Sequence, residues 1–120
     1  MPAPTCPCGL PQPYAACCGR FHDGAAPPTA ELLMRSRYTA FVRSDEEYLL
    51  RTWDPATRPQ TLGLNPRARW TGLEIRGVTD GGLFAQTGTV HFRAHHAGGV
   101  VEEDSAFRKL DGHWVYVGPV

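Results

Sequence analysis

The stretch that decides the fold is Cys6-Pro7-Cys8-Gly9, followed by Cys17-Cys18-Gly19. It holds all 4 cysteines of the 120-residue chain. A structural zinc site takes four ligands in a tetrahedron, and thiolate sulfur is a preferred ligand. The clustering therefore predicts a compact structural Zn²⁺ site, with Cys6, Cys8, Cys17 and Cys18 as its ligands.

The spacing within this stretch suits two tight turns around one ion. Pro7 fixes φ between the first two cysteines, and Gly9 lets the backbone fold back beneath the metal. Neighbouring side chains point apart on a strand, so Cys17 and Cys18 can reach one ion only where the backbone turns. His22 is a spare ligand if one cysteine of this adjacent pair faces away.

Two other interpretations of the cysteines stay open, namely two disulfides or a redox-active dithiol. Disulfides are typical of small secreted proteins, whereas residues 1–5 show neither the basic start nor the apolar run of a signal peptide. Bridges between Cys6 and Cys8 and between Cys17 and Cys18 would close very small, strained loops. Metal binding is therefore favoured, and thiols without a secretion signal indicate the cytoplasm.

The cysteine run resembles the SEC-C motif, a zinc knuckle also found at the C-terminus of the translocation ATPase SecA. The usual motif has Ser-Gly after its first glycine and often ends in Cys-His. This chain has Leu10-Pro11 there and ends in Cys17-Cys18, so the partners of SecA are not carried over. The resemblance implies a SEC-C-like knuckle over residues 1–24 that presents a surface to another protein.

A second set of motifs follows the knuckle, and its order resembles the YchJ family of SEC-C-containing bacterial proteins. The resemblance implies an NTF2-like (cystatin-like) α+β domain over residues 29–120, and it supplies no reaction. The motifs that carry it are PPTAELLMRSRYTAF (27–41), Tyr48-Leu49, Thr52-Trp53, Pro55, Glu103-x-Ser105-x-Phe107 and Asp111-Gly112-His113-Trp114-x-Tyr116.

Residue periodicity indicates the same class of fold without the resemblance. Thr29 is a good N-cap for a helix over about 29–43, and Ser44 is the expected cap of a second helix over 45–53. From Arg69 the period changes to that of strands, and glycine-rich turns separate them. Helices followed by an antiparallel meander predict helices packed on one face of a curved sheet. The expected strands are 70–78, 83–95, 100–110 and 113–117.

Composition disfavours two classes of partner. The chain has 12 basic and 12 acidic residues, and a net charge of zero argues against binding to nucleic acid. Its apolar runs stay well short of the roughly 20 residues that span a bilayer, which argues against a membrane. The length suits one domain plus the knuckle and is compatible with a homodimer.

A sheet curled around a helix leaves an open mouth, which is the expected place for a ligand pocket. Alternation along the third strand places Glu103 and Ser105 on one side. If that side faces the helices, Glu103 is a partly buried carboxyl suited to proton transfer, or else it forms an ion pair with Arg35 or Arg37. These two arginines point about 200° apart on a helix. The pocket candidates are Arg35, Arg37, Tyr38, Trp53, Trp70, Glu103, Ser105 and Trp114.

Two functional hypotheses follow. The first is a non-enzymatic cytoplasmic adaptor whose zinc knuckle binds another protein. The second is a small-molecule-binding protein or enzyme that takes a small apolar ligand in an NTF2-like cone, with Glu103 as acid or base. A filled cone with Glu103 paired to an arginine favours the first, and an aromatic-lined cavity with Glu103 unpaired favours the second.

Overall fold

The computed structural model describes residues 4–65 and 67–120. Helices come first along the chain and strands follow, in the predicted order. The strand predicted from residue 83 begins later, because Leu83 and Phe84 lie in an exposed turn. The elements are the 3-10 helix η1 (Tyr14–Ala16), helices α1 (Cys18–His22), α2 (Ala30–Val42) and α3 (Glu46–Arg51), and strands β1 (Trp70–Asp80), β2 (Thr87–His96), β3 (Gly99–Leu110) and β4 (His113–Pro119).

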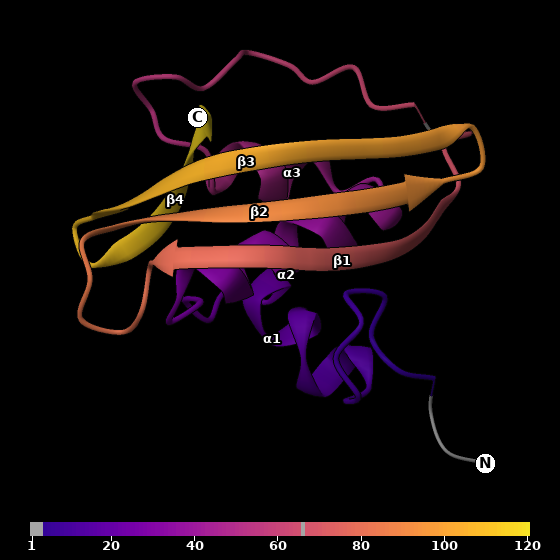
Figure 1. Cartoon of the computed structure of the whole chain (residues 1–120), viewed down its shortest axis with the longest axis horizontal. Helices are drawn as coiled ribbons and strands as arrows, with labels where there is room; N and C mark the ends of the chain where they lie inside the picture. The colour runs from indigo at the N-terminus through magenta and orange to yellow at the C-terminus, as the bar shows by residue number, and fades with distance from the viewer. Residues whose placement is uncertain (1–3, 66) are drawn as a thin grey trace.

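The four strands form one antiparallel sheet in the order β1-β2-β3-β4. The helices lie on one face of this sheet, and β4 crosses behind β3 because the sheet is strongly twisted (Figure 1). A register shift between Ala106 and Phe107 interrupts the pairing of β3 with β4. A bulge of this kind bends the strand and increases its twist, which curves the sheet around the helices.

Helix α2 is the element on which the rest of the fold packs. Thr29 caps it as predicted, since the hydroxyl accepts a hydrogen bond of 3.2 Å from the Leu32 amide. Its apolar face contributes Leu33 and Tyr38 to the main core, where they join side chains of β2, β3 and β4. Burial of this stripe gives a helix of about four turns its stability.

Helix α3 starts and ends differently from the prediction. Asp45 caps it instead of Ser44, because Ser44 has a φ of 56° and serves to reverse the chain after α2. The helix stops at Arg51 because the next residues pair with β4. The Tyr116 amide donates to the Thr52 carbonyl, and the Asp54 amide donates to the Tyr116 carbonyl, both at 2.8 Å.

The cysteine-containing segment lies beside α2, beyond the β1 edge of the sheet (Figure 1). Phe21 of α1 packs in a second core cluster with Ala40 of α2 and with Tyr48 and Leu49 of α3. The segment before residue 24 therefore shares apolar contacts with the helical layer. Within the described ranges, the helices lack the length and apolar character needed to cross a membrane.

Candidate metal centre and ligand cavity

The structure brings the four cysteines together as a buried group. Their sulfur atoms all lie within 4.8 Å of one another, and none of them forms a disulfide. A tetrahedral zinc site with Zn–S bonds of about 2.3 Å has sulfur-to-sulfur edges of about 3.8 Å. Cys8 Sγ and Cys17 Sγ are 3.6 Å apart, so this donor set fits one tetrahedral metal ion. The fit favours a metal site over disulfides.

Two backbone turns aim the sulfurs at a common point. In the first, the Gly9 amide donates to the Cys6 carbonyl at 3.2 Å, and Gly9 takes a φ of 96°. In the second, η1 ends at Cys17, whose φ of −127° and ψ of −113° are neither helical nor extended. This break lets Cys17 and its neighbour Cys18 face the same point, as their adjacency required.

Thiolate character is favoured at Cys8, whereas burial raises the pKa of the Cys17 thiol. The hydrogen bond between Cys8 and Cys18 lowers the pKa of the Cys8 thiol, and burial of that thiol opposes the shift only in part. The same hydrogen bond raises the pKa of Cys18. The thiolate is the form that binds metals, so metal binding requires the other thiols of the group to lose their protons.

His22 is not the spare ligand that the sequence allowed. Its Nε2 lies 2.9 Å from the Ser36 carbonyl oxygen, which can only accept, so Nε2 carries the proton. The other nitrogen, Nδ1, then accepts from the Tyr14 hydroxyl at 2.7 Å. Both ring nitrogens are occupied, and His22 joins the cysteine segment to α2.

Two further residues of α2 contact the cysteine segment. Arg35 donates from Nη1 to the Cys8 carbonyl at 2.6 Å and pairs through Nε with Glu31 at 2.9 Å. The buried Thr39 hydroxyl lies 3.4 Å from Cys18 Sγ. Arg35 is therefore a contact of the metal centre, and its expected place in the pocket is wrong.

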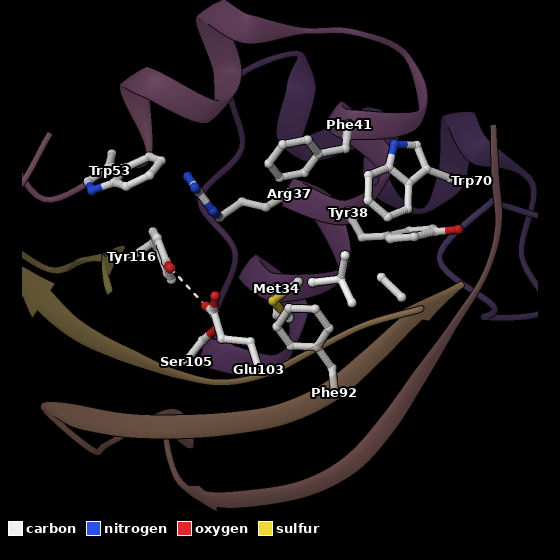
Figure 2. A pocket seen from close by; sticks show the side chains of 12 residues that line it. Met34, Arg37, Tyr38, Phe41, Trp53, Trp70, Phe92, Glu103, Ser105 and Tyr116 are labelled. Atoms are coloured by element: carbon white, nitrogen blue, oxygen red, sulfur yellow. Dashed lines mark hydrogen bonds between the residues drawn. The ribbon is translucent and has the colours of Figure 1, made fainter. Parts of the chain in front are cut away.

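A cavity of about 320 Å³ lies between α2 and the inner face of the sheet. Figure 2 shows Arg37 and Glu103 at one end, beside Trp53 and Tyr116, and Phe41, Tyr38 and Trp70 at the other end. A volume of this size suits a small organic molecule of one or two rings. The residues that line it are Met34, Arg37, Tyr38, Phe41, Trp53, Trp70, Phe92, Ala94, Val101, Glu103, Ser105 and Tyr116.

Glu103 has hydroxyl partners in this cavity instead of an arginine. It accepts hydrogen bonds through Oε2 from Ser105 and from Tyr116, the latter at 2.8 Å (Figure 2). Among the described residues, no arginine lies within 4.0 Å of this carboxylate. The expected ion pair of Glu103 is therefore wrong for Arg35 and Arg37 alike. Burial and the bond to Glu103 raise the pKa of Tyr116.

Arg37 is the other charged group at this end, and its side chain is only 3% exposed. Its Nη1 donates to the Leu49 carbonyl and to the Thr52 hydroxyl, both at 2.7 Å. The guanidinium carbon lies 5.1 Å from the centroid of the Trp53 ring and 4.5 Å from that of Tyr116. Burial lowers the pKa of Arg37 to about 10, so it stays charged at neutral pH.

The comparisons with known proteins fit this architecture. A family profile described as "YchJ, middle NTF2-like domain" matches residues 29–119. The chain belongs to the YchJ-like family. A UPF0225 protein of Streptomyces avermitilis is 63% identical over 114 residues, which are 94% of this chain and 81% of that protein. One from Xanthomonas campestris is 45% identical over 124 residues, or 97% of this chain and 94% of the relative.

Two solved structures of SEC-C motif-containing proteins share the fold of this YchJ-like chain. The solution structure from Rhodopseudomonas palustris has a TM-score of 0.80 at 30% identity and covers 96% of both chains. The crystal structure from Psychrobacter arcticus has a TM-score of 0.77 at 29% identity, covering 97% of this chain and 81% of the other. The α+β NTF2-like fold and the family resemblance are thus confirmed.

Most of the sequence's pocket candidates meet in the cavity, and two do not. Arg37, Tyr38, Trp53, Trp70, Glu103 and Ser105 line it, whereas Arg35 contacts the metal centre. Trp114 also lies elsewhere, because its indole Nε1 donates to the Pro28 carbonyl at 3.2 Å. The list of pocket candidates left out six lining residues, although three of them could have been found from spacing. Met34 and Phe41 lie one helical turn from Arg37, and Val101 alternates with Glu103 on β3. The residues missed are Met34, Phe41, Phe92, Ala94, Val101 and Tyr116.

Proposed function

We propose that this chain is a small-molecule-binding protein with a structural zinc centre. The NTF2-like domain takes a small, mostly apolar ligand in the cavity between α2 and the sheet. The observation that carries the proposal is the aromatic-lined cavity of about 320 Å³ in which Glu103 has no arginine partner among the described residues. This combination favours the ligand-binding hypothesis over the adaptor hypothesis.

The distribution of polar groups in the cavity supports this function. Ligand sites are commonly concave and apolar, with a few polar groups placed to orient the ligand. Here the rings of Phe41, Trp70 and Phe92 supply apolar walls, and Arg37 and Glu103 supply polar contacts. A filled cone would have favoured the adaptor hypothesis. Docking of another protein on the cysteine segment stays a prediction.

Zinc is the ion that we propose for the cysteine centre, and its role is structural. Four thiolates complete a tetrahedron and leave no position for a substrate, which is the pattern of structural zinc sites. His22, Arg35 and Thr39 join this centre to α2. Cysteines that bind zinc must stay out of disulfides, which suits the reducing conditions of the cytoplasm, where we place the protein.

A substitution at one residue of β3 can block the cavity, and the same substitution at the next residue provides the control. Val101 lines the cavity and is 42% exposed, whereas Val100 is 50% exposed and points to the opposite face of β3. We expect Val101→Trp to fill the cavity mouth and Val100→Trp to leave the cavity open. Both variants place a tryptophan on β3, so they differ mainly in the face of the sheet on which the new side chain lies.

Binding is measured by ¹H–¹⁵N NMR titration with naphthalene, 2-naphthamide, 2-naphthoate and 2-naphthylmethylammonium. At least one probe should shift amides next to the cavity in the wild type and in Val100→Trp. The same probe should leave Val101→Trp unshifted. If none of the probes binds the wild type, or if Val101→Trp binds as well as Val100→Trp, the cavity is not the ligand site.

A further inference from the structure

The guanidinium of Arg37 has hydrogen-bonding groups that the protein leaves open toward the cavity. Both protons of Nη1 are used by Leu49 and Thr52, whereas Nε and Nη2 make no hydrogen bond with the described residues. Within the described part of the chain, every side-chain nitrogen or oxygen that is shielded from solvent has a partner. The open N–H groups of Arg37 therefore contact accessible space, and this space is the cavity that the side chain lines.

Glu103 has a hydrogen-bond acceptor that the protein leaves unused, which complements the unused donors of Arg37. Its Oε2 accepts from both Ser105 and Tyr116, and its Oε1 accepts from no described residue. A carboxylate can only accept hydrogen bonds, so Oε1 is free to accept from water or from a ligand. The polar end of the cavity thus offers N–H donors from Arg37 and an acceptor oxygen from Glu103.

Tyr116 contacts both charged groups. The Arg37 guanidinium lies 4.5 Å from the centroid of the Tyr116 ring, while the Tyr116 hydroxyl donates to Glu103 at 2.8 Å. The cation and the anion therefore share one neighbour without contacting each other (Figure 2). Their charges sum to zero, so an anionic ligand head meets repulsion from Glu103 and a cationic head meets repulsion from Arg37.

We propose that the cavity selects a neutral, planar ligand that carries a hydrogen-bond acceptor and a hydrogen-bond donor side by side, as in an amide or a lactam edge. The acceptor contacts Nε or Nη2 of Arg37, and the donor contacts Oε1 of Glu103. The rest of the ligand is an aromatic ring system that packs on Phe41, Trp70 and Phe92. This inference rests on the ligand-binding function proposed above and adds the chemical class of the ligand.

Replacement of water explains why a neutral polar head is required and an apolar one is not enough. Without a ligand, water satisfies the open groups of Arg37 and Glu103. A purely apolar ligand would displace that water and leave Nε and Nη2 of Arg37 and Oε1 of Glu103 without hydrogen-bond partners, which is unfavourable. An amide edge reproduces both hydrogen bonds, and it adds no charge beside either residue.

The test compares four probes that share a naphthalene ring and differ only in the head group. They are 2-naphthamide, 2-naphthoate, 2-naphthylmethylammonium and naphthalene, each titrated at pH 7 against the full-length zinc-bound protein. We expect 2-naphthamide to bind at least about tenfold more tightly than the other three, a difference of about 1.4 kcal/mol. Equal or tighter binding by any of the other three overturns the proposed ligand class and leaves a ligand site in place. If no probe binds, the proposed function falls together with this inference.

A variant of Glu103 tests the role of its charge. Glu103→Gln keeps the shape and an oxygen that can accept from Ser105 and Tyr116, but it removes the negative charge. We expect the affinity for 2-naphthoate to rise about tenfold relative to that for 2-naphthamide, since the like-charge repulsion is gone. The control is Glu102→Gln, because Glu102 points to the outer face of β3, where it contacts His91 and Arg93. An unchanged affinity ratio in Glu103→Gln, or the same change in Glu102→Gln, overturns the inference.

Discussion

Thr39 places its hydroxyl 3.4 Å from Cys18 Sγ, so the helix that lines the cavity also contacts the cysteine centre. Thr39 and Arg35, one turn apart on α2, face the metal centre. Arg37 and Phe41, which lie on another side of the same helix, face the cavity. The two sites are thus joined through one helix.

Removal of the Thr39 hydroxyl should weaken metal binding. We expect Thr39→Val to lower the affinity for zinc by about 10-fold or more, because hydrogen bonds to ligating thiolates orient them and stabilise their charge. Competition with a chromophoric zinc chelator measures the affinity. Thr39→Ser keeps the hydroxyl and serves as the control. Equal affinities in the two variants would show that the hydroxyl serves only the Arg35 carbonyl, 3.2 Å away.

Loss of one metal ligand should destabilise the whole chain. The sequence suggested a separate knuckle, but Arg35 contacts the Cys8 carbonyl and Phe21 packs against α2 and α3. We expect Cys8→Ser to lower the Tm of the helix–sheet domain by at least about 5 °C, which corresponds to roughly 1 kcal/mol or more in a domain of this size. Circular dichroism at a wavelength dominated by the sheet follows the transition. Ala15→Ser, at an exposed position of the same segment, is the control, and an unchanged Tm in Cys8→Ser would show two independent units.

Gly19 should not tolerate a side chain. A Cβ at this position would lie 2.8 Å from the Tyr14 carbonyl oxygen and 3.0 Å from its ring, which is closer than atoms pack. We expect Gly19→Ala to push η1 away from α1 and to destabilise the protein by about 1–3 kcal/mol, as overpacking does. Urea denaturation measures the free energy of unfolding. Gly72→Ala is the matched control, since a Cβ there meets nothing within 4 Å, and a larger loss in that variant would refute the steric argument.

The pair of Asp54 and Arg108 should make stability depend on pH in acid. Arg108 donates to both oxygens of the buried Asp54 carboxylate, at 2.5 and 2.9 Å, and these bonds lower the pKa of Asp54. Because the pKa of Asp54 is lowered on folding, the ion pair contributes its full stability above the unfolded-state pKa of about 3.9. This stability is lost as the pH falls through the lower pKa of the folded state.

The comparison between wild type and Asp54→Asn isolates this contribution from the release of metal by acid. We expect the wild type to be more stable by a constant difference between about pH 5 and 7, and we expect that difference to shrink below about pH 4. Urea denaturation at each pH measures it. If the difference in unfolding free energy stays the same down to pH 2, the ion pair of Asp54 with Arg108 is not its source.

Much of the fold could be predicted from the sequence because its signals are local. The four cysteines lie within one short segment, so their spacing alone indicated a common ion. Thr29 marks the start of α2 as its N-cap. The change in the spacing of apolar residues from helical to alternating separates the helices from the strands. Where a cap depended on the backbone of its neighbours, as at Ser44 and Asp45, the local signal was ambiguous and the prediction was wrong.

By itself, the sequence determined the cysteine cluster, the order of helices and strands and the family resemblance, because each depends on residues near one another in the chain. Only the tertiary structure decided that Arg35 holds the Cys8 carbonyl, that Glu103 accepts from Tyr116, and that a cavity remains beside Arg37. These relationships join segments far apart in the chain. The first of them uses a backbone carbonyl, which carries no signature in the residue types. Whether a core is filled depends on the packing of side chains from all these segments, and no single segment encodes that packing.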